Sequence, residues 1–215
     1  MRYSFGYRNV KSDRVMPKVG MKAIRQAQLI DATLTVIDRV GLADASLALI
    51  AKEAGVSTGI VSHYFGDKNG LLDACMRQIL ADLYQAVGRF RQQAADEPEA
   101  RIRAIIDGNF DASQIARPVL KTWLAFWTSS LHQPALQRLQ RINDRRLYSN
   151  LVAQFARSLP HSQARDAGAA MAALIDGLWL RMTLAPQPMQ QGLNAARRLC
   201  YQHLSLWLAA ATPET

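Results

Sequence analysis

Cysteine is scarce in this 215-residue chain, and long apolar runs are missing. Cys75 and Cys200 stand far apart, and no Cys-x-x-Cys or Cys/His spacing of a zinc site occurs, so we expect neither a disulfide framework nor a bound metal. The scarcity fits a reducing cytoplasm. The N-terminal stretch MRYSFGYRNVKSDRV lacks the apolar segment of a secretory signal. Since no run of about 18 apolar residues is present, the sequence predicts a cytoplasmic protein without a membrane partner.

The motifs of common enzyme classes are also missing. The chain has no G-x-S-x-G nucleophile elbow, no G-x-G-x-x-G or phosphate-binding loop and no H-E-x-x-H metal motif. The histidines are widely separated, and none has a partner at ligand spacing: His63, His132, His161 and His203. We therefore expect no catalytic residues, no cofactor and no enzymatic activity.

Alternation of apolar and polar residues, the mark of a β-strand, is not seen, and no repeat of fixed length is found. Apolar residues instead recur at helical spacing between glycines, prolines and capping residues. The sequence predicts an all-α fold, with breaks at Gly41, Pro160 and the Pro186–Pro188 segment. The expected helices cover 22–40, 47–54, 58–64, 68–92, 98–115, 118–131, 134–159, 162–184 and 190–210.

The charge of the chain is positive throughout. The formal net charge is +9, and residues 1–70 hold ten basic against six acidic side chains. Such a balance favours a polyanionic partner, because Lys and Arg displace counterions from nucleic acid. We expect a flexible basic arm at 1–19, a helix-turn-helix DNA-binding domain at 20–66 and a helical ligand-binding and dimerisation domain at 67–215.

A helix-turn-helix pattern occupies residues 46–64. Gly55, Val56 and Ser57 form the turn, because glycine tolerates the left-handed backbone that ends a helix and Ser57 can cap the next one. Ser46 is suited to cap the first helix. We expect Ile60 and Val61 to face inward, and small or hydroxyl side chains outward, where they can contact phosphates and base edges. These outward residues are Thr58, Gly59, Ser62, His63 and Tyr64. The alternative is a plain two-helix corner in a bundle.

Longer segments carry a family resemblance: SLALIAKEAGVS at 46–57, HYF at 63–65, then Lys68 and the pair Leu71-Leu72. These segments resemble the DNA-binding domain of the TetR family of transcriptional regulators. The resemblance implies that Ser46 and Lys68 lie at helix N-termini near phosphates and that the Tyr64 hydroxyl donates to a phosphate. Phe65 is expected to be an apolar plug between helices.

The second part is similar to the choline-responsive BetI-type branch of the same family. The segments that carry this similarity are DGNFD at 107–111, WLAFW at 123–127, SSLHQP at 129–134 and QRINDRRLYSNL at 140–151. The resemblance implies a repressor of choline-to-glycine-betaine genes, a choline effector, and a homodimer formed through the last two helices. A two-fold protein would bind a palindromic double-stranded DNA operator.

Aromatic and acidic residues of this part could form a choline site. Trp123, Phe126 and Trp127 share a helix face, because they are spaced i, i+3 and i+4. Asp107, Phe110 and Asp111 form a second group, and Asp176 and Trp179 a third. Aromatic faces attract a quaternary ammonium, and a carboxylate adds Coulomb attraction. The alternatives are that these aromatics only fill the core, that a different cationic or apolar molecule is sensed, or that the chain is a helical adaptor without DNA binding.

Overall fold

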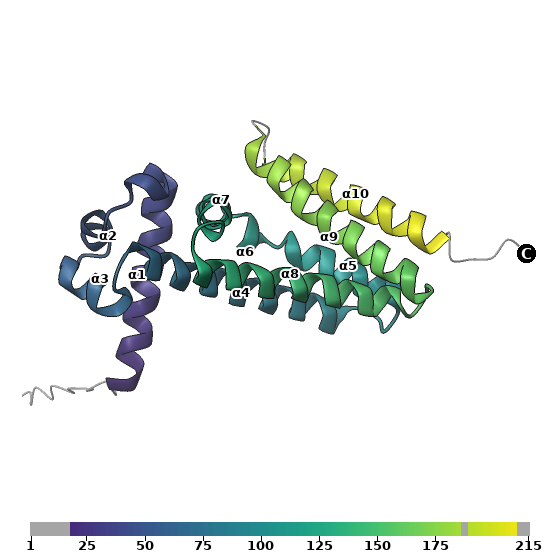
Figure 1. Ribbon diagram of the computed structural model, residues 1–215, viewed down its shortest axis with the longest axis horizontal. Helices are drawn as coiled ribbons and strands as arrows, with labels where there is room; N and C mark the ends of the chain where they lie inside the picture. Colours follow the sequence, from purple (N-terminus) through teal and green to yellow (C-terminus); the bar gives the residue numbers. More distant parts are fainter. Residues whose placement is uncertain (1–17, 186–188, 210–215) are drawn as a thin grey trace, which may run out of the picture.

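The computed structural model describes residues 18–185 and 189–209, and every regular element in these ranges is an α-helix (Figure 1). The all-α prediction is confirmed. Residues 1–17, which hold most of the expected arm, and the expected break at 186–188 lie outside the described residues. The helices are α1 (Lys18–Asp44), α2 (Leu47–Glu53), α3 (Thr58–Phe65), α4 (Lys68–Gln93), α5 (Pro98–Asn109), α6 (Ala112–Ile115), α7 (Arg117–Ser130), α8 (Pro134–Phe155), α9 (His161–Leu184) and α10 (Met189–Ala209).

Some expected helix boundaries are wrong. Helix α1 begins inside the expected arm, at Lys18, and a short further helical segment follows to Asp44. The break expected at Gly41 is present, because its backbone, with φ 77° and ψ 166°, leaves the helical region. The single helix expected at 98–115 is two helices, because Phe110 leaves the helical region and the extended Asp111 caps α6. Helix α8 stops at Phe155, short of the expected 159, and a turn in which Leu159 N–H donates to the Phe155 carbonyl leads to Pro160.

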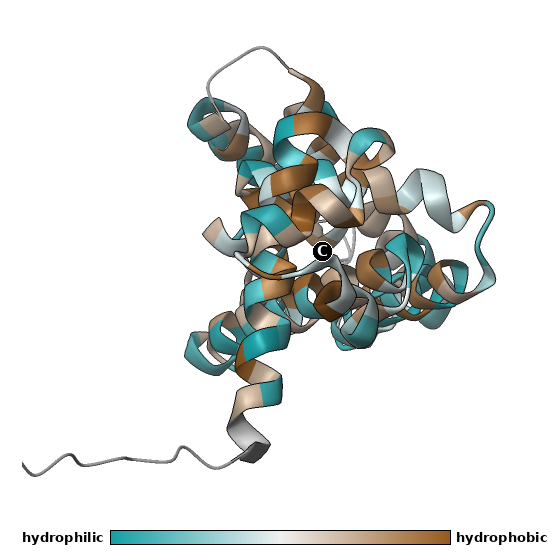
Figure 2. Ribbon diagram, turned by 90° about the vertical axis from the view of Figure 1, so that its left-hand side faces the viewer, coloured by the Kyte–Doolittle hydropathy of each residue, from teal (hydrophilic) through white to brown (hydrophobic). Residues whose placement is uncertain are grey.

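The buried apolar side chains form two clusters. The smaller cluster joins α1, α2 and α3 to the first turn of α4, and we call this part the small unit. The larger cluster runs through α4 to α10, which we call the body. Seen from the side of α2 and α3, the helices carry brown apolar and teal polar residues on the same turns, as amphipathic helices around a core do (Figure 2). The buried members of the smaller cluster are Leu29, Ala32, Val36, Ile37, Ala45, Ile50, Ala51, Val61 and Leu71.

Helix α4 connects the small unit to the body. It starts beside α3 and then packs along α5, α6, α7 and α8 (Figure 1). Its contact with α5 is close: a Cβ added at Gly108 would lie 2.6 Å from the Val87 Cα atom. A similar approach joins α9 to α8, where a Cβ at Gly168 would lie 2.5 Å from Val152 Cγ2. These contacts fix the helices that surround the pocket described below.

Helices α9 and α10 pack side by side along one edge of the body (Figure 1). By length and composition alone, α9 is the one helix in the described ranges that could cross a membrane, which the absence of a contiguous apolar run did not predict. A third of its most apolar 18-residue window is buried, by contacts with α8 and α10 among others. Part of its apolar surface therefore stays uncovered in the monomer.

Candidate DNA-binding surface and effector pocket

The turn between α2 and α3 is fixed by backbone hydrogen bonds. Gly55 has φ 66°, which lets its N–H donate to the Lys52 carbonyl over 3.2 Å while the Val56 N–H donates to the Ala51 carbonyl over 2.9 Å. The Ser46 hydroxyl accepts from the Leu49 N–H at 3.2 Å and caps α2, as expected. These hydrogen bonds therefore fix the angle between α2 and α3.

One face of α3 is buried and the other is open. Val61 is fully buried, whereas the side chains expected to face outward at Thr58, Ser62 and His63 are exposed, as is Gly59. Tyr64 is half-buried and lies edge-on to His63, with ring centroids 5.4 Å apart. Ile60 does not face inward as expected, because 38% of it is exposed. The open face of α3 therefore offers hydroxyls, an imidazole and an aliphatic group that could meet a thymine methyl.

Ser57 differs from its expected role, whereas Lys68 is the first residue of α4, as expected, and makes one further contact. The hydroxyl of Ser57 makes no hydrogen bond to the N–H groups of α3, so Ser57 is the capping residue by position only and its hydroxyl remains exposed. The Lys68 ammonium donates to the Ala43 carbonyl over 2.7 Å and closes the end of α1. Phe65 is packed against the smaller cluster but half-buried, so it is a looser plug than expected.

The body contains a hollow walled by tryptophans. The Trp179 ring lies 5.4 Å from the Trp127 ring and 6.1 Å from the Trp123 ring, centroid to centroid, at angles of 69° and 71°. Asp176, one turn before Trp179, lines the same hollow. The walls come from six helices, α4 to α9, and the remaining lining residues are Leu83, Asn109, Gln114, Gln140, Asn143, Leu147 and Ile175.

The carboxylate of Asp176 is perturbed by its position. Surrounding protein partly desolvates it, and the negative charge of Asp144 adds repulsion, so the pKa of Asp176 rises to about 6. The side chain keeps contact with solvent in the monomer. A cation in the hollow would oppose this rise, because its positive charge attracts the carboxylate and favours the ionised form.

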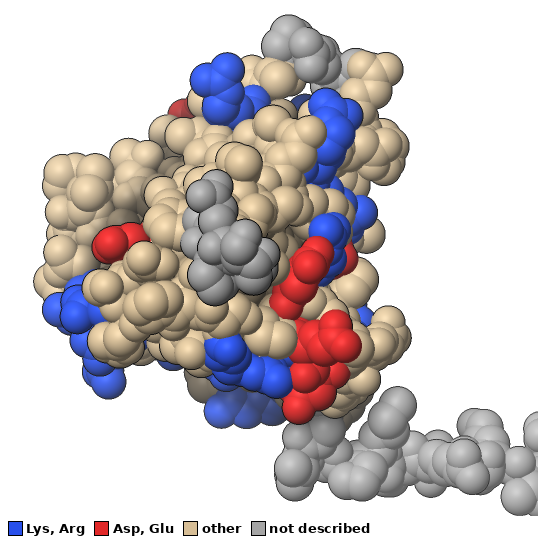
Figure 3. Space-filling view, turned by 90° about the vertical axis from the view of Figure 1, so that its right-hand side faces the viewer, with Lys and Arg blue, Asp and Glu red and all other residues tan. Residues whose placement is uncertain are grey.

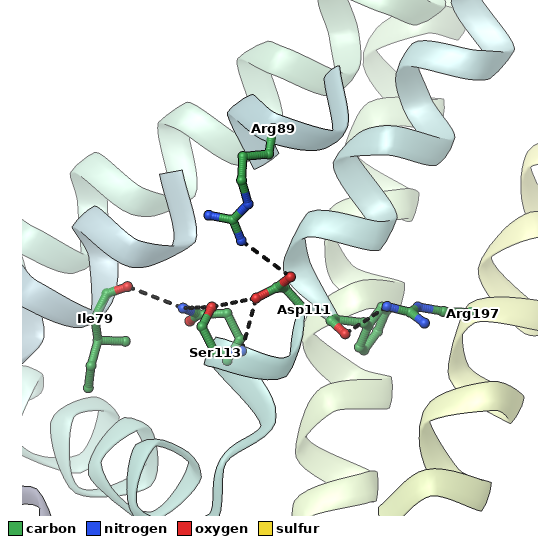
Figure 4. A network of polar contacts seen from close by, with 7 residues as sticks. Ile79, Arg89, Asp111, Ser113 and Arg197 are labelled. Atoms are coloured by element: carbon green, nitrogen blue, oxygen red, sulfur yellow. Dashed lines mark hydrogen bonds and ion pairs between the residues drawn. The ribbon is translucent and has the colours of Figure 1, made fainter. Parts of the chain in front are cut away.

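The other acidic and aromatic residues proposed for the ligand do not line this hollow. Asp111 caps α6, accepts from the N–H and hydroxyl of Ser113, and pairs with Arg89 at 3.4 Å (Figure 4). Asp107 accepts from the Tyr201 hydroxyl and pairs with Arg197 of α10 at 3.3 Å. Both carboxylates thus join helices.

Phe110 and Phe126 are fully buried in the larger cluster. The Phe126 ring supports Trp123 edge-on, with ring centroids 5.7 Å apart, and the Phe110 carbonyl accepts from Arg197 at 2.9 Å. Of the eight proposed ligand residues, the structure therefore brings Trp123, Trp127, Trp179 and Asp176 together.

A second chamber adjoins the hollow and shares Leu83, Asn109, Asn143 and Leu147 with it. Its volume is about 270 Å³, against about 30 Å³ for the hollow. The other residues of this outer chamber are Tyr84, Val87, Gly88, Arg91, Ile105, Arg146 and Asn150. Sequence reasoning missed the polar wall from α8, although Gln140, Asn143 and Leu147 stand at i, i+3 and i+7 and so share a helix face.

Helix α7 links the hollow to the small unit. Trp123 and Trp127 line the hollow, while Arg117 and Lys121 of the same helix each reach the Asp38 carboxylate of α1 at 2.9 Å. The Lys121 ammonium also donates to the Asp38 carbonyl. A movement of Trp123 and Trp127 would therefore be transmitted through α7 and its ion pairs with Asp38 to α1.

Helices α9 and α10 leave a groove of about 490 Å³ lined by Leu178, Arg181, Met182, Leu184, Ala185, Gly192, Ala195, Ala196 and Leu199. Leu184 and Leu206 are 66% and 70% exposed. The end of the body away from α2 and α3 mixes basic and acidic side chains with a larger uncharged area (Figure 3).

Within the described ranges, no three His, Cys, Asp or Glu side chains gather as a metal site would require. Burial raises the pKa of both cysteine thiols to about 12, so neither is a reactive thiolate.

An exposed recognition-type helix joined to a helical body with an internal pocket defines a ligand-sensing DNA-binding regulator. Comparison with known families agrees: residues 29–75 match the bacterial regulatory proteins of the tetR family, and residues 98–209 match the BetI-type transcriptional repressor, C-terminal. The chain belongs to the TetR family of transcriptional regulators, in its BetI-type branch. It is thus a DNA-binding repressor and not an enzyme.

Individual relatives cover almost the whole chain. The HTH-type transcriptional regulator BetI 1 of Chromohalobacter salexigens is 59% identical over 197 residues, which are 92% of this chain and 96% of that protein. BetI of Ectopseudomonas mendocina is 59% identical over 198 residues, 91% of this chain and 100% of that protein.

Solved structures share the fold. A transcriptional regulator from Pseudomonas aeruginosa PAO1 superposes with TM-score 0.74 at 27% identity, covering 94% of this chain and 96% of that one. A transcriptional regulator from Saccharomonospora viridis, solved in complex with choline, superposes with TM-score 0.71 at 17% identity, covering 85% of this chain and 96% of that one.

Proposed function

We propose that this repressor controls choline-to-glycine-betaine genes and that choline is its effector. The observation that carries the proposal is the hollow in which Trp123, Trp127 and Trp179 adjoin the Asp176 carboxylate. Each aromatic face attracts a quaternary ammonium by about 0.5–2 kcal/mol, and the carboxylate adds Coulomb attraction. The BetI-type relatives and the choline complex of a regulator with the same fold support the same effector.

On the DNA side, residues 20–66 form the operator-binding domain, and α3 enters the major groove. Lys68 contributes by holding the end of α1, and its remaining N–H donors can reach a phosphate. Ile60 joins the contact through its exposed aliphatic side chain. The remaining operator-contacting residues are Ser46, Ser57, Thr58, Gly59, Ser62, His63 and Tyr64.

Residues 67–215 bind the ligand and form a homodimer. The uncovered apolar surface of α9 and α10, including Leu184, Leu199 and Leu206, is where two copies meet. A two-fold dimer presents its two α3 helices to the halves of a palindromic operator, about 34–36 Å apart. The monomer alone could not occupy both halves.

Choline weakens operator binding because the hollow must expand to admit it. A volume of about 30 Å³ holds one or two water molecules, far less than a trimethylammonium group. The tryptophans of α7 must therefore shift, which strains the ion pairs between α7 and Asp38 on α1. The operator-binding state excludes choline, so choline favours the other state by its difference in affinity.

The test has a DNA arm and a ligand arm. Selection from random duplexes should yield an inverted repeat, and its affinity should fall steeply with salt. Calorimetry should show choline binding to the free protein, and saturating choline should weaken the operator complex. Failure to bind any duplex at low salt would contradict the DNA-binding assignment. Operator affinity unchanged at full choline occupancy would contradict choline as effector and leave another small molecule in that role.

A further inference from the structure

The effector pocket has opposite charges at its two ends. The hollow holds Asp176, with Asp144 close enough to raise the pKa of Asp176 by repulsion. The outer chamber holds Arg91 and Arg146. Because the two spaces share four lining residues, a single elongated ligand could lie in both. Such a ligand would meet a carboxylate at one end and guanidinium groups at the other.

The two guanidinium groups are available to a ligand. Among the described residues, neither Arg91 nor Arg146 donates from its side chain to an acceptor or pairs with a carboxylate. Arg146 stacks over the Tyr84 ring, 3.8 Å from its centroid, which holds its planar group at the chamber wall. The buried Tyr84 hydroxyl likewise has no hydrogen-bond partner in the part of the chain that the structure describes.

These groups disfavour choline in the outer chamber and favour an anion. Two guanidinium groups repel a quaternary ammonium, whereas they donate paired, charge-assisted hydrogen bonds to a phosphate or carboxylate. The side-chain amides of Asn143 and Asn150 add neutral donors from α8. A volume of about 270 Å³ is ample for a phosphate group.

We propose that the outer chamber is an anion subsite and that the whole pocket accepts a zwitterion, a trimethylammonium group joined by a short linker to a phosphate or, less tightly, to a carboxylate. The inference rests on the proposed function only in placing the ammonium group among the tryptophans. Phosphate is favoured over carboxylate because its charge of about −1.5 to −2 matches two guanidinium groups. The repressor would thereby respond to anionic derivatives of choline as well as to choline.

Calorimetry with three probes that differ only in the group opposite the ammonium tests the proposal. Choline presents a hydroxyl, glycine betaine a carboxylate and phosphocholine a phosphate. We expect the affinity for phosphocholine to be at least about tenfold higher than the affinity for choline, and the affinity for glycine betaine to lie between the two. In the double variant Arg91→Gln/Arg146→Gln, phosphocholine should lose this advantage while choline binds as well or better. Arg145→Gln, which removes an exposed charge from α8 outside both spaces, should leave all three affinities unchanged.

If the arginines form an anion subsite, the double variant should lose affinity for phosphocholine but keep its affinity for choline. If the arginines only support the structure, both affinities should fall. Loss of all three affinities together in the double variant would overturn the proposal, as would phosphocholine binding no tighter than choline to the unaltered protein. Choline binding without an arginine-dependent gain for phosphocholine would leave the choline effector standing and remove the anion subsite. Phosphocholine binding without choline binding would support the anion subsite and contradict choline as effector. If none of the probes bound, both the anion subsite and the choline effector would be contradicted.

Discussion

The small unit and the body differ in how far apart in the sequence the residues of their candidate sites lie. The open face of α3 is contained in eight residues, and the turn that orients it adds three more. The hollow, by contrast, takes its walls from six helices between Leu83 and Trp179. A local surface can be altered without touching the rest of the molecule, whereas a pocket of this kind shares its residues with the core.

Ser62→Glu should separate the two regions most clearly. The exposed hydroxyl lies on the open face of α3, so a carboxylate there would meet phosphates and base edges. We expect operator affinity to fall by about 100-fold, ~3 kcal/mol, with choline affinity unchanged. Fluorescence anisotropy at fixed salt measures the first and calorimetry the second. Gln85→Glu, which adds the same charge at an exposed site of α4, should leave operator binding nearly intact. A matching loss of choline binding in Ser62→Glu would contradict the separation.

Trp179→Leu addresses the body. Loss of one face of the hollow should weaken choline binding by up to about 30-fold, the upper range for a desolvated cation–π contact. Operator affinity without choline should stay near that of the unaltered protein. Because Trp179 is buried, thermal unfolding must also be followed, and some loss of stability is expected. Trp207→Leu removes a tryptophan that does not line the hollow and should spare choline binding. Equal losses in both variants would contradict the proposed role of Trp179.

The pH dependence of choline binding should arise from one residue of the body, Asp176. Asp176 has a pKa raised to about 6 in the free protein, and only its ionised form attracts the ammonium. Protonation therefore competes with choline, and affinity should fall roughly tenfold from pH 7 to pH 5. The pKa of Asp176 should drop on binding, with proton release seen by calorimetry in two buffers. Asp176→Asn should bind choline weakly at every pH; a pH dependence that survives this change would assign the titration to another group.

The smallest effect should come from Asp38→Asn, which acts on the link between the regions. This change removes the charge that Arg117 and Lys121 share, while it leaves α3 and the hollow untouched. Each binding reaction alone should be little affected, but the factor by which choline weakens operator binding should shrink by about fivefold. The ratio of operator affinities with and without saturating choline measures it. An unchanged ratio would mean that the signal passes through α4 instead.

Sequence reasoning served the small unit better than the body. The turn glycine, the Ser46 cap and the buried Val61 follow from local chemistry, which acts between residues a few positions apart. Ile60 was wrongly placed because periodicity cannot fix the rotation of a helix of two turns. In the body, spacing grouped Asp107 and Asp111 with the aromatics, but both carboxylates meet partners far along the chain, Arg197 and Arg89.

The outer chamber shows the limit of spacing most clearly. Tyr84 and Arg146 belong to different helices, and only the packing of α8 on α4 brings the guanidinium over the ring. The break between α5 and α6 was missed for a similar reason, because Phe110 leaves the helix to enter a core that assembles from distant segments. Long-range packing is not encoded in any single stretch of residues.

The narrowness of the tryptophan hollow also has a consequence in time. If choline binds among the tryptophans as proposed, a space of about 30 Å³ must first open to admit its trimethylammonium group, and binding would then wait on a motion of the protein itself. The observed association rate should then level off as choline concentration rises, at the rate of opening, and tryptophan fluorescence in a stopped-flow instrument can follow it. Such a plateau would show that the protein opens before choline binds.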